Sequence, residues 1–280
     1  MAFHRSATGI SCANPHATWV KSRIDKPAMR LLLLFLMMNA ICAGQPQIPI
    51  LVYHRIAVVR SDAMTVTTAH FREDLKMLRE RGVSFIHLND LLAWRQGRRP
   101  APAARSVVIT FDDGHLSFYR EAWPILAAQR VPVTLFLYPS CISRASYAMT
   151  WAEVQEVSLN PLVCIQSHTL WHPNLNREAK RLSAAEYARF VDRQLRDSKA
   201  ILESKVGHPV TMLAWPFGIV NPDLMERASA AGYEAAFTIQ CRAVERTDAP
   251  LALPRCLITD ENSGPRFGRF IDALLRGETP

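Results

Sequence analysis

The feature that most constrains the fold is a run from Val107 to Gly114, in which two carboxylates end an apolar stretch. The first five residues of this run are apolar and mostly β-branched, which is typical of a buried strand. Asp112 and Asp113 follow directly, and their mutual repulsion must be offset by a cation or a proton. Two interpretations remain open: a site of metal or acid–base chemistry, or the cap of a helix that begins near Leu116.

A second polar motif lies some fifty residues further on, after the apolar run 162–165. His168 and His172 are four residues apart, a spacing that places two side chains on one face of a helical turn, close enough to bind one ion. A lone histidine pair is more often part of a surface or a core. This pair ends a strand, as the carboxylates do, and Asp with two His is a common ligand set for a catalytic metal. The sequence therefore predicts a metal site.

Three motifs in this order resemble those of the polysaccharide deacetylase family (NodB-like, carbohydrate esterase family 4). They are Thr-Phe-Asp-Asp-Gly at residues 110–114, Ser-His-Thr-Leu-Trp-His at 167–172 and Trp-Pro-Phe-Gly at 215–218. The similarity runs from about residue 49 to about residue 258. The resemblance implies an α/β fold, an irregular (β/α) barrel of about seven parallel strands. It also implies a metal-dependent hydrolase that removes N-acetyl groups from an N-acetylglucosamine-containing polysaccharide.

The resemblance assigns roles to individual residues. It implies that Asp113, His168 and His172 hold a divalent metal. Zn²⁺ is expected, with Co²⁺, Ni²⁺ and Fe²⁺ as alternatives for the same donor set. Asp112 is expected to be the general base that takes a proton from a metal-activated water. The backbone N–H of Phe217 is expected to stabilise the oxyanion that forms on the acetamide carbonyl.

Two positions depart from the family pattern. Ala214 stands where relatives carry an arginine that orients the base, and Arg255 is expected to supply that charge, with a surface arginine as the alternative. The deacetylases of biofilm poly-β-1,6-N-acetylglucosamine look similar in this respect. The late Leu-x-x-His of many relatives is also absent, since no histidine follows His208. His54 is the expected substitute acid, and His115 is a second candidate.

Aromatic residues near the motifs are the expected substrate-binding groups, together with Phe217. Tyr138, Trp171 and Trp215 each have a ring suited to stacking on a sugar face. For each of them, packing in the core or at the rim of the site is an equally good interpretation.

Strands that alternate with helices indicate parallel βαβ units, here in a single domain over residues 44–280. Helical spacing predicts a helix from Phe71 to Gly82, and another over residues 118–129 that Pro124 should kink or shorten. Capping boxes open helices after Thr150 and Ser183. No GxGxxG motif follows a strand, so no nucleotide cofactor is expected.

Residues 1–43 have the pattern of a leader with a secretory signal peptide, and Met29 is an alternative start. The apolar run 31–38 is too short for a membrane span, so contact with a membrane is expected only if the leader is not cleaved. The expected location is periplasmic or secreted, and a monomer is expected. Beyond the leader, 28 Lys and Arg face 24 Asp and Glu, a mild excess without a basic aromatic run, so nucleic-acid binding is not expected.

Four cysteines lie beyond the leader, and an exported chain can form disulfides. Cys141, Cys164, Cys241 and Cys256 allow three full pairings, between which the sequence does not choose. Buried free thiols are an equally good interpretation.

Two alternatives to the N-deacetylase remain open. A catalytically idle carbohydrate-binding barrel is favoured by Ala214 and by the missing late histidine, and disfavoured by the complete Asp/His/His set. An O-deacetylase of an acetylated glycan would use the same residues on an ester.

Overall fold

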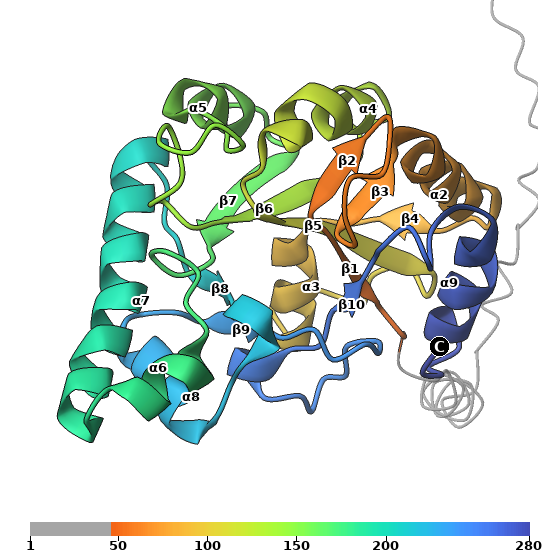
Figure 1. Cartoon of the computed structure of the whole chain (residues 1–280). Helices are drawn as coiled ribbons and strands as arrows, with labels where there is room; N and C mark the ends of the chain where they lie inside the picture. The colour runs from red at the N-terminus through yellow and green to blue at the C-terminus, as the bar shows by residue number, and fades with distance from the viewer. Residues whose placement is uncertain (1–45) are drawn as a thin grey trace, which may run out of the picture. The chain divides into compact units, whose positions relative to one another are not determined.

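A curled sheet of eight strands forms the centre of the described part of the chain, and helices pack against both of its faces (Figure 1). The computed structural model describes residues 46–280, and the predicted leader, with the alternative start at Met29, lies outside them. The strand order is β10-β1-β5-β6-β7-β8-β9, with β4 beside β5, and the pairings are parallel. The strands are β1 (Ile50–Tyr53), β4 (Ser84–Phe85), β5 (Ser106–Asp113), β6 (Val133–Leu137), β7 (Val163–Ser167), β8 (Met212–Ala214), β9 (Ala235–Phe237) and β10 (Cys256–Leu257).

The two ends of this strand order are bridged by the segment that leads into β10. The Leu253 N–H donates to the Ala236 carbonyl (2.8 Å), and the Thr238 N–H donates to the Leu253 carbonyl (2.8 Å). Three residues later, Cys256 pairs with Leu51 of β1. One short segment therefore contacts both edges of the sheet. The predicted irregular (β/α) barrel of parallel strands in a single domain is confirmed.

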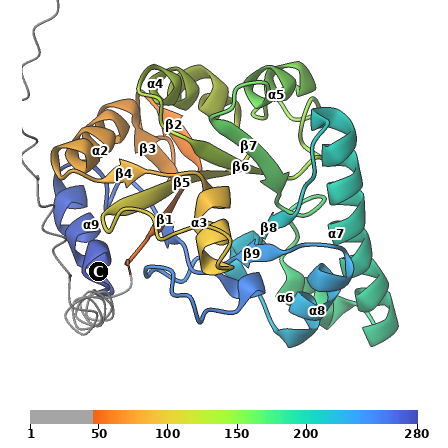
Figure 2. The ribbon, with the colours of Figure 1, turned by 180° about the vertical axis from the view of Figure 1, so that it is seen from behind.

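Eight α-helices cover the sheet in the described residues, with α3 on the side seen in Figure 2. They are α2 (Thr68–Glu80), α3 (Leu88–Arg95), α4 (Trp123–Ala128), α5 (Trp151–Ser158), α6 (Leu175–Arg181), α7 (Ala184–Val206), α8 (Pro222–Ala230) and α9 (Phe267–Leu275). Both predicted capping boxes are present, with Thr150 before α5 and Ser183 before α7. Within residues 46–280, no helix combines the length and the apolar character that a membrane span requires.

The predicted helix 118–129 is a continuous helical segment from Leu116 to Ala128, with a π-helical turn just before Pro124. Residues Phe118–Ala122 form one π-helical turn, and α4 follows, with Pro124 in its first turn. Proline has no N–H to donate and fits where the first helical donors are unpaired anyway. The helix is not shortened at Pro124, and the distortion there is the π-helical turn that precedes the proline.

The core is built on β5, seven of whose eight residues are buried. On one face of the sheet, four aromatic rings pack with centroids 5.1–5.8 Å apart: Tyr53, Phe71, Phe111 and Phe118. Burying an apolar side chain of this kind stabilises the fold by roughly 1.5–3 kcal/mol. The position of β5, and of the residues at its end, is therefore strongly determined.

A buried carboxyl group on α2 joins the first strand to the C-terminal region. The Tyr53 hydroxyl (3.1 Å) and the Ser263 hydroxyl (2.6 Å) donate to Asp74 Oδ2, and the Gly264 N–H donates to Oδ1 (2.7 Å). Burial raises the pKa of Asp74 to about 7, although these hydrogen bonds act in the opposite direction. This group is a structural link rather than part of a pocket.

Two short strands that the sequence analysis missed lie between β1 and α2. β2 (Arg55–Ala57) and β3 (Thr65–Thr67) pair with each other in parallel, apart from the main sheet. The loop between them carries Met64, which lines the pocket described below.

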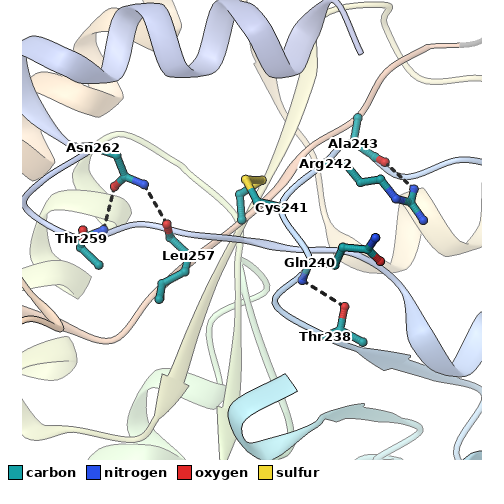
Figure 3. The surroundings of a disulfide bond; sticks show 9 residues. Thr238, Gln240, Cys241, Arg242, Ala243, Leu257, Thr259 and Asn262 are labelled. Carbon is teal, nitrogen blue, oxygen red and sulfur yellow. Dashed lines mark hydrogen bonds between the residues drawn. A yellow bond between two sulfur atoms is a disulfide. The ribbon is translucent and has the colours of Figure 1, made fainter. Parts of the chain in front are cut away.

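One of the possible disulfides is present, between Cys241 and Cys256 (Figure 3). It ties the loop after β9 to β10, next to Arg255 in the chain. Cys141 and Cys164 are free thiols. Both interpretations of the cysteines therefore hold, each for one pair.

Candidate active site

A pocket opens where the central strands end. In a barrel of parallel strands, side chains from several strands meet at this carboxyl end. Polar groups from β5 and from the loop after β7 lie beside apolar side chains of later loops. The lining residues are His54, Met64, Asp112, Asp113, His168, His172, Trp215, Phe217, Ile239 and Leu257.

The end of β5 turns its two carboxylates toward different partners. Asp113 has φ of 75°, a left-handed conformation that Asp tolerates better than most residues. Gly114 follows with φ of 77°, and a Cβ there would lie 2.9 Å from Leu137 and Ile142 side-chain atoms. The helix-cap interpretation is wrong. A helical turn does begin at Leu116, but the Ser117 N–H donates to His115 Nδ1 (3.1 Å), and neither carboxylate accepts an N–H of this turn within the described residues.

Three atoms that could bind a metal ion lie close together beside Asp112. The Asp113 Oδ1 atom lies 3.6 Å from His168 Nε2 and 3.8 Å from His172 Nε2, and the three ligand atoms are within 4.8 Å of one another. Ligands of a four-coordinate Zn²⁺ lie roughly 3.3 Å apart, given bonds of about 2 Å. Asp113 Oδ1 is buried without a hydrogen-bond partner among the described residues. An unpaired buried oxygen is costly, so this set fits a cation.

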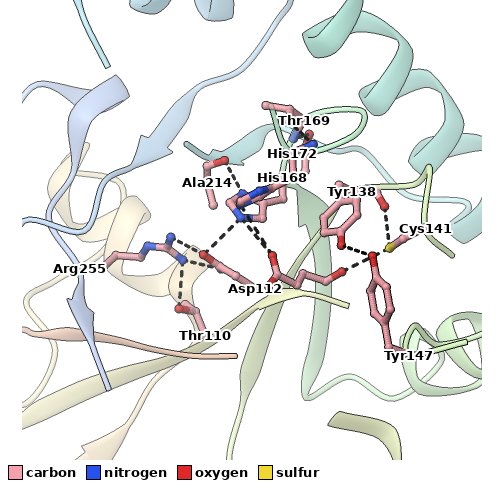
Figure 4. A network of polar contacts seen from close by, with 12 residues as sticks. Thr110, Asp112, Tyr138, Cys141, Tyr147, His168, Thr169, His172, Ala214 and Arg255 are labelled. Carbon is pink, nitrogen blue, oxygen red and sulfur yellow. Dashed lines mark hydrogen bonds and ion pairs between the residues drawn. The ribbon is translucent and has the colours of Figure 1, made fainter. Parts of the chain in front are cut away.

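The backbone carbonyl of Ala214, the residue that stands where relatives carry an arginine, fixes the orientation of the His168 ring. Its Nδ1 lies 2.7 Å from the backbone oxygen of Ala214 (Figure 4). A carbonyl oxygen only accepts, so Nδ1 carries the proton and Nε2 presents its lone pair toward Asp113. This is the tautomer that a metal ligand needs.

His172 reaches the same place from a turn that is not helical, contrary to the prediction. Thr169 (φ 65°) and His172 (φ 60°) are both left-handed. The His172 N–H donates to Thr169 Oγ1 (3.3 Å), and the two imidazoles meet edge to face at 4.6 Å. Burial and the neighbouring His168 lower the pKa of His172 to about 4, so its ring is neutral at pH 7.

Asp112 binds a buried arginine (Figure 4). Arg255 Nη1 and Nη2 each lie 2.7 Å from one oxygen of the Asp112 carboxylate, and Arg255 Nε donates to the Thr238 carbonyl (3.2 Å). Burial raises the pKa of Asp112, but the Arg255 charge and its hydrogen bonds outweigh it and hold this pKa at about 2. Arg255 is 0% exposed, so the surface-arginine alternative is wrong.

The two candidate acids differ in position. His54 follows β1 and lines the pocket, and its Nδ1 is buried without a partner among the described residues. Burial lowers the pKa of His54, whereas the charges of Asp112 and Asp113 act in the opposite direction. His115 lies outside the pocket lining, and its Nδ1 bonds with Ser117 Oγ (2.9 Å). The geometry favours His54.

Residues 215–218 form the pocket wall opposite β5. Phe217 is 55% exposed and left-handed (φ 56°), and its ring lies 4.7 Å from that of His172. A Cβ at Gly218 would lie 2.6 Å from Ile239, so the close approach of these loops requires glycine. Trp215 is buried, and its Nε1 donates to the Leu251 carbonyl (2.9 Å). Trp215 is therefore a rigid part of the pocket wall, whereas the exposed ring of Phe217 can contact a ligand.

The other two aromatic residues lie beside the pocket. The Tyr138 ring is 5.6 Å from that of His172, and its hydroxyl bonds with Tyr147 (3.0 Å). Burial raises the pKa of Tyr138. Trp171 is 43% exposed and lines a separate groove against α7.

Three apolar lining residues were missed by the sequence analysis: Met64, Ile239 and Leu257. They come from loops or a strand end far apart in the chain, without a motif around them. Only the fold brings them to the same pocket.

Comparisons with known proteins agree with this geometry. Residues 99–236 match the family model described as polysaccharide deacetylase. The chain is 27% identical over 242 residues to the poly-beta-1,6-N-acetyl-D-glucosamine N-deacetylase of Escherichia coli (strain K12), covering 74% of this chain and 36% of that protein. The chain thus spans about a third of that relative's length. The enzyme of the same name from Staphylococcus aureus (strain MSSA476) is 26% identical over 204 residues, covering 70% of this chain and 69% of the relative.

A solved structure shows the same architecture. IcaB from Ammonifex degensii is 25% identical, with a TM-score of 0.72, and the match covers 81% of this chain and 98% of that one. The resemblance inferred from the motifs is confirmed. The named relatives are N-deacetylases, which agrees with the predicted class of enzyme, a hydrolase of amide bonds.

Proposed function

Because residues 99–236 belong to the polysaccharide deacetylase family, we propose that this protein is a metal-dependent hydrolase of N-acetyl groups on an N-acetylglucosamine-containing polysaccharide. One observation carries the proposal. The ligand atoms of Asp113, His168 and His172 face one another beside an ionised Asp112, and Asp113 Oδ1 is buried without a hydrogen-bond partner in the described residues. A carbohydrate-binding protein has no use for a base held next to a cation site.

The metal ligands in this proposal are Asp113, His168 and His172. A bound divalent cation, Zn²⁺ in the first instance and Co²⁺, Ni²⁺ or Fe²⁺ otherwise, lowers the pKa of water and polarises a carbonyl. Ala214 contributes the carbonyl that keeps the His168 Nε2 lone pair directed inward.

The remaining residues handle protons and charge. Asp112 is the general base, and Arg255 keeps it ionised and fixed in orientation. The Phe217 N–H is the proposed oxyanion donor, in a backbone conformation that its left-handed φ sets. His54 is the proposed acid for the leaving amine, because it lines the pocket.

The substrate class is proposed from the relatives. Two of them, from distant bacteria, are named poly-beta-1,6-N-acetyl-D-glucosamine N-deacetylases, and we propose a β-1,6-linked polymer for this chain too. The mostly apolar pocket wall suits an acetyl methyl group. The disulfide and the leader pattern support a periplasmic or secreted location.

The decisive experiment measures acetate release from N-acetylglucosamine oligomers of β-1,4 and β-1,6 linkage. The protein is tested after chelation, after zinc or cobalt add-back, and as the Asp112→Asn variant. We expect metal-dependent release that prefers the β-1,6 oligomer and falls by about 10²–10⁴-fold in the variant.

Two results would contradict the proposal. Glycan binding without release in the presence of any of these metals would favour the idle barrel, to which the absent late histidine points. Faster release from O-acetylated glycans than from the amides would identify an O-deacetylase.

A further inference from the structure

A groove lies against α7, and Trp171, the residue before the candidate ligand His172, is part of its lining. Its floor and walls include Trp171, Phe190 and the arginines 181, 189 and 193. Part of the surface of α7 thus forms a concave surface with an exposed aromatic side chain. We call it the Trp171 groove.

The Trp171 groove and the candidate active site are connected by neighbouring residues in the sequence. Trp171 directly precedes the ligand His172, and its backbone N–H donates to Gln194 Oε1 on α7 (3.2 Å). Its ring meets Phe190 edge-on at 5.8 Å and stays 43% exposed. The groove and the pocket are therefore lined by consecutive residues of the chain, Trp171 and His172.

The charge of the groove is positive and only partly compensated. Arg181 pairs with Glu178 (2.6 Å), and Arg193 lies 3.7 Å from Asp197 in an exposed contact of little strength. The one acidic lining residue, Glu186, accepts from the Ser183 N–H at the start of α7 (3.0 Å). Within residues 46–280, Arg189 forms no ion pair.

We propose that the Trp171 groove binds the glycan beyond the reacting sugar, and that it accepts N-acetylated units and rejects deacetylated ones. This inference rests on the proposed function. Trp171 offers an aromatic face to a sugar ring, and Arg189 and Arg193 offer N–H donors to hydroxyl and acetamide oxygens.

The rejection follows from the chemistry of the product. Hydrolysis of the acetamide adds water and leaves acetate and a primary amine, which carries a positive charge when it is protonated. Such an ammonium group next to Arg189 and Arg193 is a like-charge contact, which disfavours binding. The enzyme therefore binds stretches that it has already deacetylated less tightly than acetylated ones. As a result, the free amines of its product are spaced along the polymer rather than clustered.

The test compares a fully acetylated β-1,6-linked pentamer with a pentamer that carries one free amine next to an acetylated unit. Binding is measured calorimetrically in the Asp112→Asn variant, and KM and kcat in the active protein. We expect the free amine to weaken binding by about fivefold. The double change Arg189→Gln and Arg193→Gln should abolish this difference, whereas Arg196→Gln, on the same helix but outside the groove, should keep it.

A change at Trp171 tests the stacking. Trp171→Ala should raise KM for the pentamer several-fold with little change in kcat, and leave the dimer unaffected. Metal content is measured in parallel, so that a disturbed His172 is recognised.

The inference is overturned if the protein binds both pentamers equally, if the arginine changes leave the preference intact, or if an anionic glycan binds more tightly than the acetylated pentamer. Because binding is measured in an inactive variant, absence of acetate release would contradict only the proposed function.

Discussion

Two buried carboxyl groups of this protein, Asp112 and Asp74, have opposite electrostatic environments. Both are almost completely inaccessible, at 3% and 0% exposure. Asp112 faces the guanidinium of Arg255, and its pKa is about 2. Asp74 is surrounded by hydroxyl and N–H donors from β1 and the C-terminal region, and its pKa is about 7.

The difference shows what decides the ionisation of a buried acid here. Hydrogen bonds from neutral donors lower the pKa of Asp74 but do not overcome the cost of burying its charge. A full positive charge at 2.7 Å does overcome that cost for Asp112. The molecule therefore keeps one carboxylate ready as a base and uses the other as a structural link.

Removing the positive charge of Arg255 should cause the largest loss of stability. Arg255→Gln leaves the Asp112 charge buried and uncompensated, which typically costs about 3–5 kcal/mol of unfolding free energy. Urea denaturation at pH 7 measures this loss, with Arg276→Gln, in an exposed pair with Glu278, as the control expected to have almost no effect. Equal losses in the two variants would show that Arg255 does not compensate Asp112.

The pH dependence of stability should come from the other carboxyl group. The folded state raises the pKa of Asp74 from 3.8 to about 7, so its contribution is fully present below pH 4 and is lost as the pH rises through 7. His70 is the charged neighbour that acts against this shift. Relative to Asp74→Asn, the wild-type protein should lose on the order of 4 kcal/mol between pH 4 and pH 8. Parallel stability curves for the two proteins would refute this assignment.

The disulfide should matter because it fastens the segment that carries Arg255. Cys241 and Cys256 are 15 residues apart, and closing a loop of this length contributes about 3 kcal/mol in the chain-entropy model. Dithiothreitol should lower the melting temperature of the wild-type protein and of Cys164→Ala, but not that of a variant with serine at both paired positions. A wild-type melting temperature that reductant does not change would exclude the bond.

The smallest effect is expected at a single neutral donor to Asp74. Ser263→Ala removes the hydroxyl 2.6 Å from Oδ2 and should cost about 1 kcal/mol, the usual net value of one hydrogen bond. Ser229→Ala, an exposed site on α8, is the matched control and should have almost no effect on equilibrium unfolding. A cost above that of Arg255→Gln would reverse the comparison.

The parts of this site that sequence could predict are those next to strand ends. Asp112 and Asp113 directly follow an apolar run and His168 comes three residues after another, so the ends of parallel strands place them together. The role of Arg255 beside Asp112 was inferred from the family pattern, because Ala214 stands where relatives carry the arginine that orients the base. The turn at His172 was predicted wrongly as helical, because its two left-handed residues, Thr169 and His172, are not glycines and give no signal.

The rest of the pocket depends on long-range packing. Met64 and Ile239 lie on connecting segments, where side-chain periodicity carries no information about neighbours. The disulfide was similarly hidden, because Cys241 and Cys256 meet only when the segment before β10 crosses from β9 to β1.

That crossing segment also determines the order in which the protein can mature. Asp112 and Arg255 are 143 residues apart, so the carboxylate is synthesised long before its partner. Non-local contacts of this kind form late, after the entropy of a long loop has been lost. A nascent or truncated chain that ends before residue 255 contains both metal-binding motifs yet buries an unpaired charge at the end of β5. In this protein, Asp112 therefore gains its counter-charge only when the segment leading into β10 has been synthesised and has paired with β1.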